Sequence, residues 1–333
     1  MSGQNHGHTP VDVGLYLEMA RAHYASLVKR SNYSSEAFTV SNGQELVVGW
    51  YAEHEAYDYE RWLFEGIEIN TAAVALDFGC GPGRMIRRLT RRFSRVDGID
   101  ISPEVLDVAR GRCAHLVAPP RLFVTDGQSV PDELADTYDV AFSVICLQHI
   151  CVYSIRRRIF EGLYRALKPG GLLSFQMGYG PGHRAMIDYF GEYVAAEGTN
   201  GSADVTILHP SELATDLADV GFTSAAFTLR PTGPGDTHGA WIFVRTLKPG
   251  LSDLVSMSPR DNAAAGFGPL VRDAGAAERA RRTYTEHGLP RRRRHLEQQI
   301  ATLREDAGRL RADLAAATGS PAEATAGTSS DPS

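Results

Sequence analysis

Short apolar runs alternate with longer amphipathic stretches along most of this chain, from about residue 72 to about residue 245. An apolar run bounded by polar residues or glycine predicts a buried strand, and alternation with helices is typical of parallel sheets built from βαβ units. The pattern therefore predicts a doubly wound α/β domain with a seven-stranded, mostly parallel sheet. The predicted strands are Ala72–Phe78, Arg95–Asp100, Leu122–Thr125, Asp139–Ile145, Leu172–Met177, Ala225–Leu229 and Ala240–Arg245.

The helices between these strands carry start and stop signals. Ser102, Pro103 and Glu104 predict a helix start, because serine caps, proline suits the first turn and an acid complements the helix dipole. The amphipathic stretch from Tyr153 to Leu167 is followed by Lys-Pro-Gly-Gly, which predicts a helix stop. Further helices are predicted at Met85–Arg92, Ala185–Ala196 and Ser211–Val220.

Segments of different composition flank this domain, which we place at residues 71–250. We expect residues 1–70 to form a helical, aromatic-rich extension, whose rings either close over a ligand or pack on the sheet. Residues 251–290 are rich in Ala, Gly, Arg and Asp and predict a linker. The tail at residues 318–333 has too little apolar bulk to fold, which predicts disorder.

Residues 291–317 predict a coiled-coil helix. Apolar residues recur there at alternating steps of four and three, which places them on one helix face as a heptad seam. Isoleucine at one seam position and leucine at the other favour two parallel strands, so we expect this helix to add to a homodimer whose larger interface lies elsewhere. The seam comprises Leu296, Ile300, Leu303, Ala307, Leu310 and Leu314.

The charge balance disfavours nucleic acid and anionic membranes as partners. The formal net charge is -6, so the chain as a whole lacks the positive field that such partners require. The basic run Arg291–Arg294 is short, and we interpret it as a solvated helix start. Because no apolar run is long enough to span a bilayer and the N-terminus is polar, we expect no membrane segment and a cytoplasmic protein.

The spacing of cysteines and histidines predicts neither disulfides nor a metal centre. The four cysteines form no C-x-x-C pair and no secreted disulfide framework, so we expect free thiols. The eleven histidines show no zinc-ligand spacing, and we expect no metal site.

A glycine-rich turn follows the first predicted strand and leads into a helix. Its three glycines let the backbone pass close to a ligand, while the helix N-terminus offers free N–H groups. Asp100 lies at the end of the second strand, where a carboxylate can accept both hydroxyls of a ribose. The glycine spacing differs from the G-x-G-x-x-G fingerprint of nicotinamide dehydrogenases. Asp77 before the turn would repel a pyrophosphate and would attract an amino group or a sulfonium.

The stretch Leu76–Leu89 resembles the first motif of class I S-adenosylmethionine-dependent methyltransferases. Val96–Ser102 resembles the second motif of that family, and Thr125–Gly127 matches the place where the family binds the adenine amino group. Tyr138–Ile150 is similar to the fourth-strand motif, and Leu167–Leu172 to the signature that precedes the fifth strand. The resemblance covers the whole predicted α/β domain in the family's order. It implies a Rossmann-like fold with S-adenosyl-L-methionine as methyl donor.

The resemblance also implies a role for each residue of the cofactor site. Asp77 orders the turn or attracts the ammonium group of the methionine part, and Asp100 holds the ribose. Asp126 with Gly127 reads the adenine. The predicted cofactor-binding residues are Asp77, Gly79, Cys80, Gly81, Gly83, Arg84, Asp100, Ile101, Asp126, Gly127, Ile145 and Gln148.

His149 is the candidate general base. It follows the fourth predicted strand, at the edge where ligands bind in open α/β sheets, and a base is needed where the acceptor must lose a proton. The alternative is a histidine that only packs or orders a loop. His183, His209 and His238 lie where this family builds its acceptor pocket, with a surface or capping role as the alternative for each. We expect at least one of the four histidines to contact the substrate.

These features predict methyl transfer to a hydroxyl of a small polar acceptor, a sugar or secondary metabolite in a biosynthetic pathway. The preference for oxygen rests on the histidines and on the absence of an Asn/Asp-Pro-Pro-Tyr motif after the fourth strand, where Leu147–Ile150 stands instead. One alternative is methyl transfer to nitrogen or carbon of a small molecule, and another is a methyltransferase that acts on RNA. A third is a non-catalytic, cofactor-binding module that recognises partners through its coiled coil.

Overall fold

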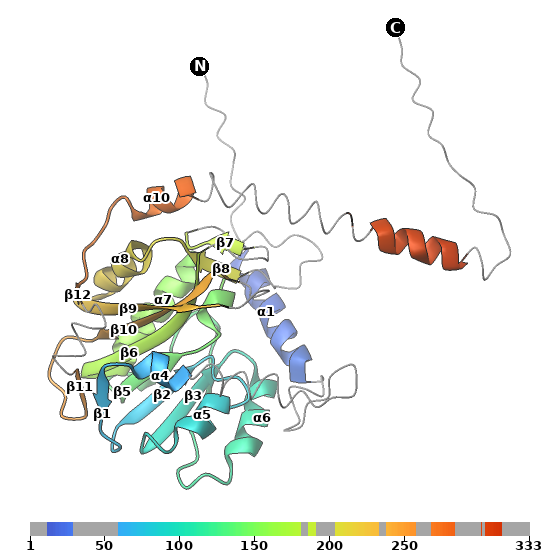
Figure 1. Ribbon diagram of the computed structural model, residues 1–333. Helices are drawn as coiled ribbons and strands as arrows, with labels where there is room; N and C mark the ends of the chain where they lie inside the picture. The colour runs from blue at the N-terminus through green and yellow to red at the C-terminus, as the bar shows by residue number, and fades with distance from the viewer. Residues whose placement is uncertain are drawn as a thin grey trace.

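The computed structural model describes residues 12–28, 59–180, 186–190, 204–232, 238–257, 268–283, 301 and 304–314. Within these residues, one large sheet is covered by helices on both faces (Figure 1). The strands of its main path are, in spatial order, β12 (Gly268–Pro269), β9 (Ser224–Pro231), β10 (Ala240–Leu247), β6 (Leu167–Tyr179), β5 (Tyr138–Ser143), β2 (Val74–Phe78), β3 (Arg95–Asp100) and β4 (Leu122–Val124).

The chain winds this sheet in two directions from its middle. It runs from β2 outward through β3 to β4, then returns to β5 on the other side of β2 and continues to β6. These five strands pair in parallel, whereas β10 is antiparallel to both β6 and β9. The predicted doubly wound, mostly parallel α/β architecture is confirmed. Ligands of such sheets bind at the point where the winding reverses, here between the carboxyl ends of β2 and β5.

Over the part of the chain that the structure describes, the sheet contains ten strands, and seven of them are the predicted ones. The others are β12 and two short strands, β7 (Met186–Asp188) and β8 (Asp204–Ile207). β8 pairs in parallel with the far end of β6, and β7 pairs with β8. The predicted helix Ala185–Ala196 is therefore wrong at its start, because hydrogen bonding to a sheet edge overrides local helix preference there.

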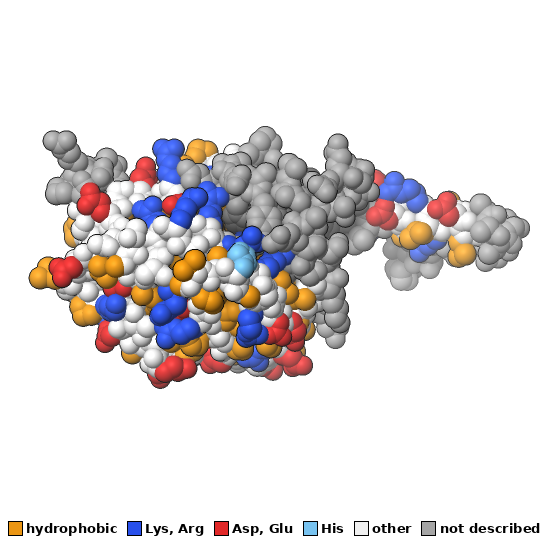
Figure 2. Space-filling view, turned by 90° about the horizontal axis from the view of Figure 1, so that it is seen from below, with side chains coloured by type: hydrophobic (Ala, Val, Ile, Leu, Met, Phe, Trp, Pro, Cys, Tyr) orange, Lys and Arg blue, Asp and Glu red, His pale blue; other side chains and the backbone are white. Residues whose placement is uncertain are grey.

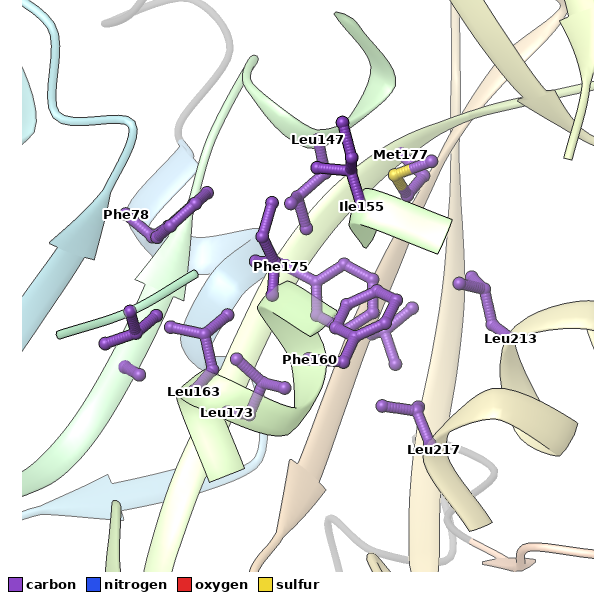
Figure 3. Close-up of a cluster of buried hydrophobic side chains, with 14 of the residues drawn as sticks. Phe78, Leu147, Ile155, Phe160, Leu163, Leu173, Phe175, Met177, Leu213 and Leu217 are labelled. Atoms are coloured by element: carbon purple, nitrogen blue, oxygen red, sulfur yellow. The ribbon is translucent and has the colours of Figure 1, made fainter. Parts of the chain in front are cut away.

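Two apolar cores lie on opposite faces of the sheet. One face is covered by α4 (Tyr59–Phe64), α5 (Arg84–Leu89) and α6 (Pro103–Cys113), and the other by α7 (Tyr153–Ala166) and α8 (Ser211–Val220). On the second face, Phe160 of α7 packs on Phe175 of β6 with ring centroids 5.1 Å apart. Figure 3 shows these rings among Leu163, Leu213 and Leu217. Helices thus cover both faces of the sheet, which leaves the loops at one edge of the sheet for ligand binding.

The capping signals of the sequence form as predicted. The Ser102 hydroxyl accepts the backbone N–H of Val105 at 3.3 Å, with Pro103 in the first turn of α6. Helix α7 ends at Ala166, one residue before its predicted end. The Lys-Pro-Gly-Gly segment that follows is not a loop, because β6 already begins at residue 167 and pairs with β5 through a register shift. Gly170 allows this with a φ of +77°.

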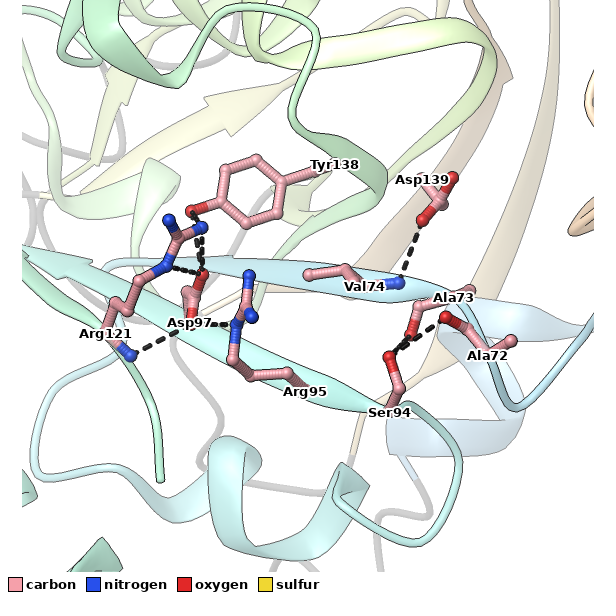
Figure 4. Close-up of polar contacts among 9 residues, drawn as sticks. All are labelled: Ala72, Ala73, Val74, Ser94, Arg95, Asp97, Arg121, Tyr138 and Asp139. Atoms are coloured by element: carbon pink, nitrogen blue, oxygen red, sulfur yellow. Dashed lines mark hydrogen bonds and ion pairs between the residues drawn. The ribbon is translucent and has the colours of Figure 1, made fainter. Parts of the chain in front are cut away.

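A buried acid network ties the amino ends of the strands together (Figure 4). Asp97 in β3 is fully buried and accepts from Arg95 Nε at 2.9 Å, Arg121 Nε at 2.8 Å and the Tyr138 hydroxyl at 3.1 Å. A buried carboxylate needs partners that compensate its negative charge, and here two guanidinium groups and a hydroxyl do so. Asp97 is therefore structural and lies at the edge opposite to Asp100, the acid that ends the same strand.

The N-terminal segment contributes two helices to the described structure, α1 (Val13–Val28) and α4. In α4, Trp62 stacks on Phe243 of β10 at 5.8 Å, and the buried Arg245 guanidinium lies 3.5 Å from the Glu65 carboxylate. These α4 aromatics pack on the sheet, which is the second of the two alternatives predicted. Trp50, Tyr51 and Tyr57 lie outside the described residues.

The segment at residues 251–290, expected as a linker, contains three described elements. Strand β11 (Val255–Met257) pairs with β1 (Ile67–Ile69), which lies within the segment expected to be helical. β12 adds to the edge of the sheet, and α10 (Ala276–Thr283) lies against α8.

Residues 304–314 form a helix whose seam residues Leu310 and Leu314 are 69% and 63% exposed. The seam positions Leu296, Ile300 and Leu303 lie outside the described residues. No helix among the described residues is both long and apolar enough to cross a bilayer.

The packing of α7 on the sheet makes a prediction about stability. Phe160→Ala removes a fully buried ring, and we expect it to lower the free energy of unfolding by about 3–5 kcal/mol. Leu251→Ala is the control, because that side chain is 96% exposed and its loss should change the same quantity by less than about 0.5 kcal/mol. Urea unfolding followed by circular dichroism measures both, and equal effects of the two changes would contradict this account of the core.

Candidate functional site

The turn after β2 is bonded to the end of the neighbouring strand β3. The backbone N–H groups of Gly79 and Cys80 both donate to the Ile99 carbonyl, at 2.8 and 2.9 Å. The N–H of Gly81 donates to Asp100 Oδ2 at 3.0 Å. The turn therefore stands at the carboxyl edge of the sheet in one fixed position.

Two of the turn's glycines are required by the close approach of other side chains. A Cβ added at Gly79 would lie 2.2 Å from Cys146 Sγ, and one at Gly83 would lie 2.9 Å from Cys113 Sγ. Both glycines also have positive φ values, 74° and 82°, a backbone conformation that residues with a side chain rarely adopt. Gly83 ends the turn as the N-cap of α5, whose first residue is Arg84. The helix N-terminus thus opens directly beside the turn.

Two predicted acids flank this turn from adjacent strands. Asp77 is only 2% exposed, and burial raises the pKa of its carboxyl group to about 8, against a lowering by Arg84 and a further rise from Asp100. None of the described residues gives the Asp77 carboxylate a hydrogen bond. Asp100 accepts from the N–H groups of Gly81 and Ser102, both at 3.0 Å. Burial raises the Asp100 pKa, and these bonds oppose the rise.

The third predicted acid, Asp126, orders its own loop at the end of β4. Its Oδ1 accepts the N–H groups of Gln128 and Ser129, both at 2.8 Å. Partial burial raises the pKa of Asp126, but these hydrogen bonds prevail and hold it below its ordinary value. Gly127 has a φ of +85°, and a Cβ there would lie 2.4 Å from Ile101 Cδ1. The structure therefore packs Ile101 against the predicted adenine loop.

Helix α1 connects this loop with the loop that carries His149. Arg21 donates to the Asp126 carbonyl at 2.7 Å. The Tyr16 hydroxyl donates to the His149 carbonyl at 3.3 Å and accepts the N–H of Cys151 at 3.0 Å. These contacts place α1 across the carboxyl edge, on both sides of the candidate site.

His149 ends a short 3-10 turn after β5, with 31% of its side chain exposed. Its Nδ1 lies 2.7 Å from Oδ1 of Asp204, the first residue of β8. The second oxygen of Asp204 lies 3.8 Å from Nε2 of His238, which is buried. His149 and His238 thus share one carboxylate, at the same edge as the glycine turn.

The other three predicted histidines lie in different surroundings, and substrate contact stays a prediction for each. His209 lies just before α8, where its backbone N–H donates to Glu212 Oε1 at 2.7 Å and its Nδ1 accepts the N–H of Ser211 at 3.3 Å. His183 lies outside the described residues. His238 packs on Gly178 of β6, where a Cβ would lie 2.0 Å from the ring.

The remaining predicted cofactor residues line the loop after β5 or the turn. Ile145 has a φ of +48°, an unusual value for a β-branched residue and one that clusters at ligand sites. Gln148 is fully buried, and its side-chain nitrogen lies 3.4 Å from His149 Nε2. Cys80 is buried in the turn, which raises the pKa of its thiol well above the ordinary value and keeps it protonated.

The sequence interpretation missed Asp204 and Tyr16. Both act on the His149 loop from far along the chain, at separations of 55 and 133 residues. The run Val-Thr-Ile after Asp204 is rich in β-branched residues and was a usable strand signal. Nothing in the sequence near Tyr16 points to residue 149.

Residues 75–171 match the family model described as a methyltransferase domain. Malonyl-[acyl-carrier protein] O-methyltransferase of Salmonella typhimurium is 36% identical over 104 residues, which are 31% of this chain and 38% of that one. Phosphoethanolamine N-methyltransferase 2 of Caenorhabditis elegans is 34% identical over 122 residues, 36% of this chain and 27% of that one. The chain thus spans well under half the length of either relative. Residues 75–171 are a methyltransferase domain of the class I S-adenosylmethionine-dependent type, as the motifs predicted.

Solved structures similar to this chain include one described as a DhpI–SAH complex. It is 19% identical, with a TM-score of 0.47, over 71% of this chain and 98% of that one.

The buried Asp77 carboxyl group makes a prediction about pH. Its pKa is about 8 in the folded chain and 3.8 in the ordinary, solvated state, so the fold favours the protonated form. The contribution of this carboxyl group to the free energy of unfolding is therefore greatest below about pH 4, and it is lost as the pH rises through 8. We expect Asp77→Asn to lack this loss, so that its stability advantage over the wild type grows between about pH 5 and 8.5.

Urea unfolding at several pH values measures the difference. Asp107→Asn is the control, because Asp107 is an exposed acid on α6. Stability curves of Asp77→Asn and wild type that run parallel over this pH range would contradict the prediction.

Proposed function

We propose that this chain is an S-adenosylmethionine-dependent methyltransferase that methylates a hydroxyl group of a small polar acceptor. The methyltransferase domain at residues 75–171 supports the reaction class. The observation that carries the proposal is the pair of carboxylates, Asp77 and Asp100, that flank the glycine turn. S-adenosylmethionine carries ribose hydroxyls and a positively charged end. One carboxylate can accept the ribose hydroxyls, and a second can face the positive charge.

The residues at this edge fit such a cofactor. Asp100 keeps lone pairs beyond those used by Gly81 and Ser102, so it can accept the ribose hydroxyls as well. Asp77 is buried without a hydrogen bond from the described residues, and a bound cation would favour its ionised form. The turn and the N-terminus of α5 offer backbone N–H groups to a carboxylate. We assign the adenine to the loop of Asp126 and Gly127.

The bound cofactor supplies a methyl group on a positively charged sulfur, ready for in-line displacement. What the chain must add is alignment and, for a hydroxyl acceptor, a base. His149 lies at the carboxyl edge beside the cofactor turn and is the most exposed member of its polar cluster. We assign it the role of general base.

The carboxylate behind His149 supports oxygen as the acceptor atom in this proposal. A neutral amine attacks through its lone pair and loses a proton easily afterwards, whereas an alcohol needs a base during the attack. The Salmonella relative is named an O-methyltransferase and the Caenorhabditis relative an N-methyltransferase, so relatives do not choose between the atoms. The contact between His149 and Asp204 is what supports our choice of oxygen.

The surface fits a small acceptor better than a nucleic acid. On the face shown in Figure 2, Lys and Arg side chains are interspersed with Asp, Glu and apolar ones over the described residues. The described residues of this face therefore form no continuous basic stripe of the kind that RNA binding uses. A sugar or secondary metabolite in a biosynthetic pathway is the acceptor class that we propose.

A homodimer that uses the C-terminal helix completes the proposal. Leu310 and Leu314 are mostly exposed on the helix at 304–314. In a homodimer, the same heptad seam of a second copy would pack against them. All four cysteines are free, which suits the reducing cytoplasm.

Cofactor binding tests the proposal most directly. We expect S-adenosylhomocysteine, which shares the adenosine, to bind the wild type and to bind Asp100→Asn about 10- to 100-fold more weakly, because a charged hydrogen bond to the ribose is lost. Isothermal calorimetry measures the dissociation constants. Asp107→Asn should bind like the wild type. No heat from the wild type would refute the proposed cofactor.

The dimer is tested through its seam. Leu310→Glu with Leu314→Glu places charges where two helices meet, and we expect the dimer to dissociate at least about tenfold more easily. Sedimentation velocity over a range of protein concentrations measures this. Arg309→Ala is the control, because Arg309 lies on the side of the helix away from the seam and its loss should leave the dimer unchanged. A wild-type chain that sediments as a monomer throughout would contradict the dimer.

A further inference from the structure

The two ring nitrogens of His149 have neighbours of opposite kinds. Nδ1 lies 2.7 Å from the carboxylate of Asp204, which can only accept a hydrogen bond. Nε2 lies 3.4 Å from the side-chain nitrogen of Gln148, which can only donate. Both neighbours are satisfied by one tautomer, with the proton on Nδ1 and the lone pair on Nε2. That tautomer is the one in which Nε2 can take a proton.

Asp204 is held in place by the extension of the sheet. β6 continues past the end of β5, and β8 pairs there with Gly178 opposite Thr206. This pairing brings the first residue of β8 to the His149 turn, with only 10% of the Asp204 side chain exposed. A hydrogen bond to a buried carboxylate is stronger than one in water. The position of Asp204 therefore follows from backbone pairing, and its influence on His149 is strong.

The far side of the Asp204 carboxylate faces His238. That ring lies flat against Gly178, where any side chain would collide with it, and edge-on to Trp241 at 4.7 Å. Its Nε2 lies 3.8 Å from Asp204 Oδ2. Asp204 is thus enclosed between two histidines, of which only His149 is exposed to a ligand.

We propose that Asp204 is the positioning residue of the methyl transfer, holding His149 with its proton on Nδ1 so that Nε2 faces the acceptor hydroxyl. This inference rests on the proposed function. The Gln148 amide occupies, in this structure, the place beside Nε2 that the hydroxyl takes when the acceptor binds. Gln148 thus belongs to the acceptor side, in addition to the cofactor side assigned to it from the sequence.

The proton and electron balance follows from this arrangement. The acceptor's O–H bond breaks and its proton goes to His149 Nε2, while the oxygen electron pair forms the bond to the methyl carbon. The electrons of the carbon–sulfur bond return to sulfur. The resulting imidazolium keeps its proton on Nδ1 and donates it as a hydrogen bond to the Asp204 carboxylate, which stabilises the positive charge until the new proton passes to water.

The tautomer of His149 is measured directly by ¹⁵N NMR of the imidazole rings in the full chain, with His149→Gln to assign its signals. We expect the wild type to hold the proton on Nδ1. In Asp204→Asn an amide can donate to Nδ1, so we expect the ratio of the two tautomers to shift at least about tenfold toward Nε2–H, the effect of one charged hydrogen bond. Asp107→Asn is the matched control, and the His209 signals report an intact fold.

The outcomes separate the inference from the proposed function. A wild-type His149 with its proton on Nε2 overturns the inference even if Asp204→Asn does not fold, and so does an unchanged tautomer in a folded Asp204→Asn. Binding of S-adenosylhomocysteine is measured on the same samples and should be equal in wild type and Asp204→Asn. Absence of that binding in the wild type refutes the proposed function, whereas the tautomer result stands by itself.

Discussion

The pairing of β2 with β3 is the constraint on which the cofactor side of this molecule depends. The carbonyl of Ile99 receives two N–H groups of the following turn, and Asp100 receives a third through its side chain. The end of one strand therefore fixes the shape of the loop that leaves its neighbour. Asp77 and the start of α5 take their positions from that loop, so a single shift in register between the two strands would separate the acids.

The acceptor side depends on a different pairing. β6 is longer than β5, and its free edge beyond β5 is taken up by β8. That addition brings Asp204 to His149, and the antiparallel β10 brings His238 to the other side of the same carboxylate. One half of the site is thus built by neighbouring strands in sequence order. The other half is built by segments that are far apart along the chain.

This difference decides what could be predicted from the sequence. The span of β3 and the Ser102 cap follow from local patterns, and the structure confirms both. Asp97 and Asp100 differ only in their place along one strand, and the sequence placed the second at the ligand edge. β8 and its Asp204 were missed because their effect arises from pairing with β6. The Lys-Pro-Gly-Gly segment was predicted to stop the preceding helix, and the helix ends just before it, but the sequence did not show that pairing with β5 brings this segment into the sheet.

The buried carboxylate behind His149 also restricts which hydroxyl the proposed reaction can use. A carboxylic acid is already ionised near pH 7, so a base would add nothing to its methylation. An alcohol keeps its proton until the attack, and only there does a base backed by Asp204 lower the barrier. A second anion close to Asp204 would also meet a buried negative charge that His149 and His238 already share. The arrangement therefore suits a neutral hydroxyl that approaches the exposed edge of His149, with any acidic group of the acceptor held well away from β8.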